Sequence, residues 1–104
     1  MNTTHGTARE LLAPDRLGLD TRVAFRKAAV QLLDTLPDGT GQLIIDLAPT
    51  RQVDSAGLGV LMLIQRRAAE RRQTIVLRNP NDELRFLLVV TKLADLFHIE
   101  AGVA

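Results

Sequence analysis

Cysteine, tryptophan and tyrosine are all missing from this chain of 104 residues, and only three phenylalanines are present. Without cysteine there can be neither a disulfide bond nor a thiolate metal site. No apolar run approaches the roughly 20 residues needed to span a bilayer. The first residues, Met1 to Gly6, lack the basic and apolar regions of a signal peptide. We therefore expect a cytoplasmic protein that does not insert into a membrane.

An excess of one charge is missing as well. The 13 basic and 12 acidic residues give a formal net charge of +1, which provides no basic face for nucleic acid. The two histidines, His5 and His98, have no ligand-like neighbours in the sequence, so neither a metal nor a cofactor is expected. A chain of this length buries one core. We predict a flexible segment over residues 1–8 and a single domain over 9–104.

Strands and helices alternate along the first half of the chain. Arg9 to Ala13 is predicted to be a short strand that ends at Pro14. Asp20 is a plausible N-cap for a helix that runs to about Leu36, with an apolar stripe at helical spacing. The stripe consists of Phe25, Ala28, Ala29, Leu32 and Leu36. The segment from Gln42 to Leu47 is apolar on both faces, which is typical of a central strand.

The second half continues the alternation. A helix from Leu58 to Arg72 is predicted to precede a strand over residues 74–77, followed by a third helix over 84–90 and a short edge strand over 96–99. The pattern predicts an α/β fold in which a small mixed or partly parallel β-sheet packs against three to four helices.

The most informative segment is Val53-Asp54-Ser55-Ala56-Gly57-Leu58-Gly59, where a polar loop becomes an apolar helix. A hydroxyl at this point lies at a positively polarised helix N-terminus, where a phosphate is electrostatically favoured. One side of the helix is predicted to face the core, namely Leu58, Leu61, Ile64 and Ala68. The opposite side carries Ser55, Gly59, Met62 and Arg66, with Leu63 beside them.

A hydroxyl beside an uncovered apolar patch is typical of a regulated protein-binding surface. The alternative is that the helix is buried on two sides by its own domain, and periodicity alone leaves both interpretations open. The surface that we expect a partner to contact comprises Asp20, Asp54, Ser55, Ala56, Gly57, Gly59, Met62, Leu63 and Arg66.

The ordered set of motifs resembles the STAS domain family. The strand Leu43-Ile44-Ile45-Asp46-Leu47 and the segment from Val53 to Leu61 are similar to the signature of that family. The turn Leu17-Gly18-Leu19-Asp20-Thr21 and the segment Thr91 to Phe97 are similar to its flanking segments. Lys92 stands where a glycine is common, so a left-handed backbone there would carry an energetic cost. The resemblance spans about residues 17–99 and implies a STAS-like fold.

The resemblance also implies a function. In an anti-sigma factor antagonist the serine after the motif aspartate, here Ser55, accepts phosphate from an anti-sigma factor serine kinase, and a phosphatase removes it. The unmodified antagonist captures the kinase and frees a sigma factor, with no enzymatic activity of its own. Other family members act without phosphorylation, as a subunit that binds the ATPase of a phospholipid-trafficking ABC transporter or as a stressosome-type scaffold.

Several residues keep a purely structural interpretation. Ser55 can be a phosphoacceptor, an N-cap or both, and Asp54 can orient the Ser55 hydroxyl, assist a partner's metal–nucleotide site or act as a competing cap. Gly57 and Gly59 permit close approach either of a partner or of a neighbouring strand. The arginines at 66, 67, 71 and 72 indicate a solvated helix face, with contact to a phosphate or an acidic partner as the less favoured alternative. A phosphate on Ser55 is expected to weaken an apolar interface, because its charge would be desolvated there without a compensating cation.

Overall fold

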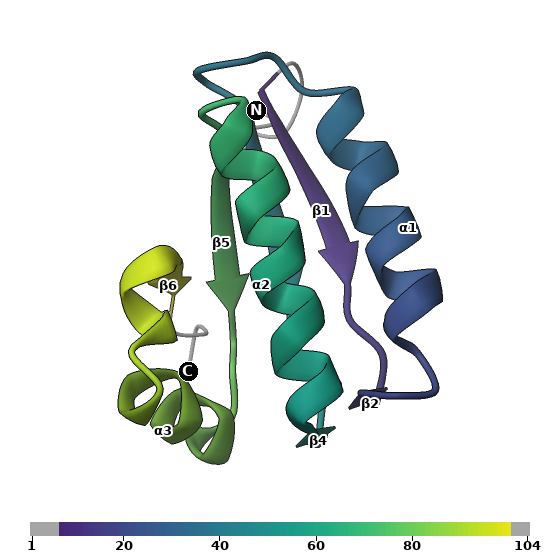
Figure 1. Cartoon of the computed structure of the whole chain (residues 1–104), viewed down its shortest axis with the longest axis vertical. Coiled ribbons are helices and arrows are strands. Elements are labelled where there is room, and N and C mark those ends of the chain that lie inside the picture. Colours follow the sequence, from purple (N-terminus) through teal and green to yellow (C-terminus); the bar gives the residue numbers. More distant parts are fainter. Residues whose placement is uncertain (1–6, 101–104) are drawn as a thin grey trace.

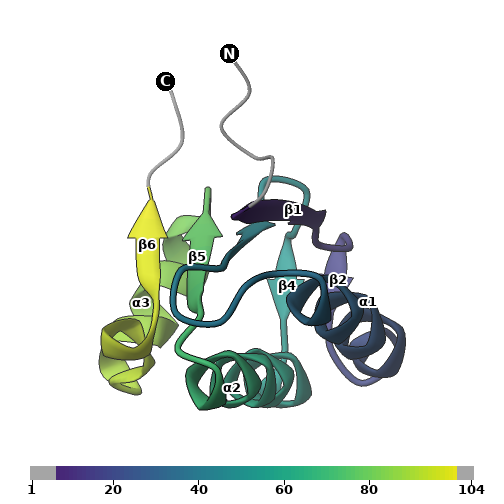
Figure 2. The ribbon, with the colours of Figure 1, turned by 90° about the horizontal axis from the view of Figure 1, so that it is seen from above.

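The structure, a computed structural model, describes residues 7–100 and has two layers. A four-stranded sheet forms one layer, and the helices lie together against one of its faces (Figure 2). Among the described residues no helix is both long and apolar enough to cross a membrane. Of the segment over residues 1–8 that was predicted to be flexible, residues 1–6 fall outside the described part of the chain, whereas Ala8 is buried and begins the first strand.

The sheet has the strand order β1-β3-β5-β6, and all its neighbouring strands are parallel. Its strands are β1 (Ala8–Leu12), β3 (Gln42–Asp46), β5 (Thr74–Arg78) and β6 (His98–Glu100). The helices are α1 (Arg22–Asp34), α2 (Ser55–Glu70) and α3 (Asp82–Val90), followed by a 3-10 turn η1 (Leu93–Leu96). The short strands β2 (Arg16–Leu17) and β4 (Gln52–Val53) form a separate parallel pair.

The predicted α/β fold is confirmed, and the described sheet is parallel throughout rather than mixed. Successive strands are added in one direction, so right-handed crossovers place their helices on the same face. As a result α1 and α2 run side by side in the same direction, and both begin at the carboxyl edge of the sheet (Figure 1). The same edge carries the pair β2–β4, which leads directly into α2.

The core lies between the sheet and the helices. The inward side chains of β3 and β5 are Leu43, Ile45, Ile75 and Leu77, all 2% exposed or less. The predicted core side of α2 is confirmed for Leu61, Ile64 and Ala68, while Leu58 is only partly buried. The predicted stripe is confirmed for Phe25, Ala29 and Leu36, which are buried, whereas Ala28 and Leu32 are only partly buried. Leu33 is buried in addition to the predicted positions.

The start of α1 differs from the prediction. Asp20 is exposed and is not the N-cap; that position belongs to Thr21, whose side chain makes no capping hydrogen bond. The Thr21 hydroxyl instead donates to the carbonyl of Arg16 at 2.7 Å and accepts from the amide of Gly18 at 3.1 Å. Its role is therefore to close the turn between β2 and α1. The predicted start of the helix was therefore correct to within one residue, but the prediction named Asp20 and not Thr21 as the N-cap.

Lys92 stands where a glycine is common in the family, and its backbone is left-handed, with φ of 63°. Its amide donates to the carbonyl of Val89 at 3.0 Å and ends α3. A non-glycine residue in this region costs about 1–2 kcal/mol. The turn persists because η1 and β6 follow it and pack onto the same core through Phe97.

Candidate functional site

Asp54 organises the loop that precedes α2. Its Oδ1 accepts a hydrogen bond from the amide of Gly57 at 2.9 Å, so Asp54 is the N-cap of α2. Its Oδ2 accepts from the amide of Leu19 at 3.2 Å, which joins this loop to the turn before α1. Gly18 allows this approach, because a Cβ atom on Gly18 would overlap the Asp54 carboxylate. One carboxylate therefore holds the N-termini of two helices together.

The amide of Gly57 is the main cause that lowers the pKa of Asp54, followed by the amide of Leu19. A lowered pKa in the folded state means that ionised Asp54 contributes to stability above its unfolded-state pKa. That contribution is lost as the pH falls through the folded-state value.

We predict that Asp54→Asn, which keeps an acceptor oxygen but cannot titrate, reduces the loss of stability below about pH 4. Urea midpoints of both proteins between pH 2 and pH 7 measure the difference, because all other carboxylates are common to the two chains. Parallel pH profiles would show that Asp54 does not sense protonation through these contacts.

Ser55 is the first residue of α2 and is exposed. It is not the cap, because Asp54 takes that role, and no hydrogen bond of its hydroxyl is found among residues 7–100. Asp54 makes its contacts with backbone amides and not with the Ser55 hydroxyl. The hydroxyl is thus chemically available at a helix N-terminus, which confirms its predicted exposure.

The two motif glycines have different surroundings. A Cβ atom on Gly57 would lie 2.8 Å from the carbonyl carbon of Leu17 and 2.9 Å from Cγ1 of Val53, so this glycine lets α2 approach β2 and β4. A Cβ atom on Gly59 would have no neighbour within 4 Å. Gly57 is buried beneath the surface, whereas Gly59 is part of it. Gly57 is therefore required for packing against the neighbouring strands, whereas Gly59 leaves the surface open.

A groove runs between the start of α1 and the part of α2 from Ser55 to Arg66, and we call it the Ser55 groove. The side from α1 consists of Arg22, Val23 and Arg26. The side from α2 includes Ser55, Ala56, Gly59, Met62, Leu63 and Arg66. Val23 and Leu63 are 62% and 50% exposed, so apolar surface is open to solvent beside the hydroxyl.

Six of the nine residues predicted to contact a partner share this groove, namely the six from α2. Asp20 and Asp54 lie in the neighbouring depression around the β2–α1 turn. Gly57 supports the site from below. The sequence did not reveal the contribution of α1, although Arg22 and Arg26 at a spacing of four residues are a weak signal for one shared helix face.

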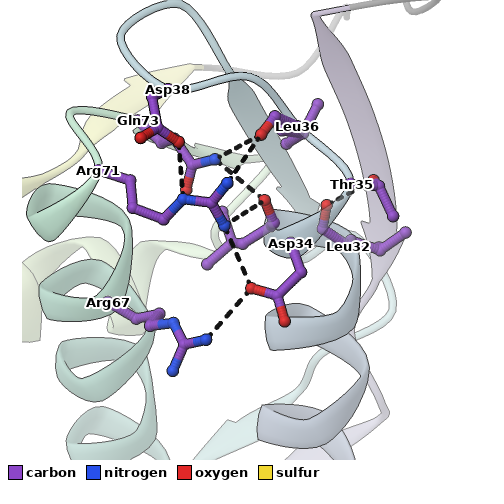
Figure 3. A network of polar contacts seen from close by, with 9 residues as sticks. Leu32, Asp34, Thr35, Leu36, Asp38, Arg67, Arg71 and Gln73 are labelled. Atoms are coloured by element: carbon purple, nitrogen blue, oxygen red, sulfur yellow. Dashed lines mark hydrogen bonds and ion pairs between the residues drawn. The ribbon is translucent and has the colours of Figure 1, made fainter.

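The other end of the α1–α2 pair is closed by ion pairs (Figure 3). Asp34 of α1 contacts Arg67 and Arg71, each at 3.2 Å, and Asp38 contacts Arg71 at 2.7 Å. Buried Gln73 adds hydrogen bonds to the carbonyls of Leu33 and Leu36 at 3.0 and 3.1 Å. The interpretation of this arginine cluster as a solvated face is confirmed for the exposed residues at 66, 67 and 72, although Arg67 also pairs with Asp34. Arg71 departs from it, because its side chain is only partly exposed and contacts two carboxylates.

Comparisons with known proteins agree with this fold. A family model described as "Mlab, STAS domain" matches residues 6–99. The structure is similar to that of a proposed anti-sigma factor antagonist from Thermotoga maritima, TM1081, with a TM-score of 0.75, 21% identity, and coverage of 90% of this chain and 80% of the other. An NMR structure of TM1081 gives a TM-score of 0.73 at 22% identity, covering 88% and 72%.

A third structure, the unphosphorylated form of the anti-sigma factor antagonist SpoIIAA, gives a TM-score of 0.71 at 12% identity and covers 99% of this chain and 86% of the other. No curated protein matches the sequence. At these identities the structural likeness concerns the fold.

Proposed function

We propose, because the chain belongs to the STAS domain family, that it is a protein-binding domain acting as an anti-sigma factor antagonist. Its partner is an anti-sigma factor serine kinase, and Ser55 is the residue that the kinase modifies and a phosphatase restores. The observation that carries the proposal is the Ser55 hydroxyl, which is exposed at the start of α2 and borders an open apolar groove.

The local structure supports phosphorylation without unfolding. A phosphate adds between one and a half and two negative charges, and a helix N-terminus stabilises such charge. The hydroxyl has no described hydrogen bond to lose, and the cap of α2 is supplied by Asp54. Modification of Ser55 therefore does not disturb the Asp54 contacts that hold the loop in place.

The first experiment is phosphorylation by the candidate kinase and ATP, followed by intact mass. We expect one phosphate on the wild-type chain and none on Ser55→Ala. Thr21 is a matched control, because its hydroxyl is engaged with the carbonyl of Arg16; Thr21→Val should still accept one phosphate on Ser55. Phosphate on Ser55→Ala, or none on the wild-type chain with an active kinase, would contradict the proposal.

A second candidate function is a non-phosphorylated subunit of a phospholipid-trafficking ABC transporter. It is supported by Ser55-Ala56-Gly57-Leu58, which is similar to the hydroxyl-Ala-Gly-Leu loop of those subunits, and by the matching family model, whose description names Mlab. A stressosome-type scaffold would use the same surface. Co-purification of the tagged chain with an ABC ATPase and permease, with Ser55 unmodified in cells, would favour the transporter subunit over the antagonist.

A further inference from the structure

The two ends of the α1–α2 pair differ in their charges. At the end shown in Figure 3, Asp34 at the end of α1 and Asp38 in the loop after it face Arg67 of α2 and Arg71, the residue that follows α2. All four side chains are paired. At the Ser55 groove, Arg22 and Arg26 of α1 share a surface with Arg66 of α2. None of the residues lining this groove is acidic, and no ion pair to these three arginines occurs within residues 7–100. Three positive charges without an ion-pair partner among the described residues thus line the groove that Ser55 also borders.

This arrangement opposes the stability of the isolated domain. Arg22 begins α1, whose first turn contains no acidic residue, so its charge adds to the positive end of the helix dipole. Arg22 and Arg26 are also separated by four residues, where like charges destabilise a helix by about 0.2–0.5 kcal/mol. Both effects are small and both destabilise the helix, and a negatively charged group beside the arginines would remove them.

The nearest acid of the motif does not provide that neighbour. Both oxygens of the Asp54 carboxylate are engaged, one with the amide of Gly57 and the other with the amide of Leu19. Asp54 lines the depression on the other side of the loop and not the Ser55 groove. The described domain thus offers these three arginines no ion-pair partner, and a partner protein or a modification of Ser55 can supply one.

The apolar part of the groove sets the shape of what fits. The side chain of Val23 is 62% exposed and that of Leu63 is 50% exposed. Gly59 leaves open space in the groove, because a Cβ atom at this position would have no neighbour within 4 Å. We propose that the Ser55 groove binds a segment of the partner protein that has an apolar side chain flanked by carboxylates. This inference rests on the proposed function for the identity of the partner as a protein, and it adds the chemistry of the contacting segment.

The same charges give a physical basis for regulation. A phosphate on Ser55 would lie within the arginine-lined groove, where it competes with the partner's carboxylates for the same guanidinium groups and repels them. The sequence had suggested that a phosphate would find no cation at the interface, whereas this proposal places it in a groove that three arginines line. Release of the partner then follows from charge competition rather than from an unpaired buried phosphate.

The test uses the full chain labelled with 15N and two synthetic helical peptides. The peptides share one central leucine and one length, and they differ only in having glutamates or lysines beside the leucine. We expect the glutamate peptide to shift the amide resonances of residues 22–26 and 55–66, and the lysine peptide to leave them unchanged. The double variant Arg26→Glu/Arg66→Glu should weaken binding of the glutamate peptide by on the order of 10-fold or more, since rim charges act through screened attraction.

Arg85→Glu is the control for a charge reversal outside the groove, because it lies on exposed α3 and makes one of the two reversals that the double variant makes. It should bind the glutamate peptide as the wild-type chain does. Equal binding of both peptides, no binding of the glutamate peptide, or shifts centred elsewhere would overturn the inference. Neither peptide requires the kinase, so a chain that binds the glutamate peptide but is never phosphorylated would contradict the proposed function alone.

Discussion

Gly57→Ala is expected to destabilise the domain by about 3 kcal/mol, at the upper end of the usual cost of overpacking. The new methyl group would overlap the carbonyl group of Leu17 and press against Val53. The carbonyl belongs to backbone in β2, so it cannot move aside as a flexible side chain would. Either α2 or the β2–β4 pair must shift, and the core contacts of both are strained.

The matched control is the same substitution two residues along the same helix. A Cβ atom on Gly59 meets nothing within 4 Å, so Gly59→Ala should stabilise α2 by up to about 1 kcal/mol through helix propensity alone. The two variants have identical compositions and opposite expected signs. Urea unfolding at neutral pH measures the free energy of unfolding of both variants. In thermal unfolding, Gly57→Ala should lower the melting temperature by roughly 10–20 °C. Similar stabilities of the two variants would show that the close approach of α2 to β2 is not required.

Ser55→Glu is expected to weaken binding of the partner kinase by about 100-fold or more and to leave the fold intact. Stability should change by no more than about 1 kcal/mol in the favourable direction, because an acid in the first turn interacts well with the helix dipole. Binding suffers because the new carboxylate competes with the partner's carboxylates for the arginines of the groove and repels them, and a 100-fold loss of affinity corresponds to about 3 kcal/mol.

Ser55→Gln separates charge from size, since it has the length of glutamate without the charge. Isothermal titration with the purified kinase gives the affinity of the wild-type chain and of both variants, and thermal unfolding confirms that all three are folded. We expect Ser55→Gln to bind far better than Ser55→Glu. Equal weakening by both would mean that the groove responds to bulk, and unchanged binding by Ser55→Glu would contradict a switch at this position.

The architecture near the site was largely predictable because it depends on local patterns. The apolar run of β3 and the helical spacing of Leu61, Ile64 and Ala68 predicted a central strand and an amphipathic helix, and both are found. The exposure of Ser55 also followed from its position before that helix. Short elements were missed, since the two-residue strands β2 and β4 have no periodicity to detect.

The sequence by itself determined that one small α/β domain presents a serine at the start of an apolar helix. Only the tertiary structure decided which groups surround that serine. Asp54 contacts Leu19 across 35 positions in the chain, and Arg22 reaches the groove because α1 and α2 lie parallel on one face of the sheet. Periodicity reports which side of a helix is buried, but it carries no information about which other helix lies beside it. The charge of the Ser55 groove is therefore a property of the packed helices and not of the motif.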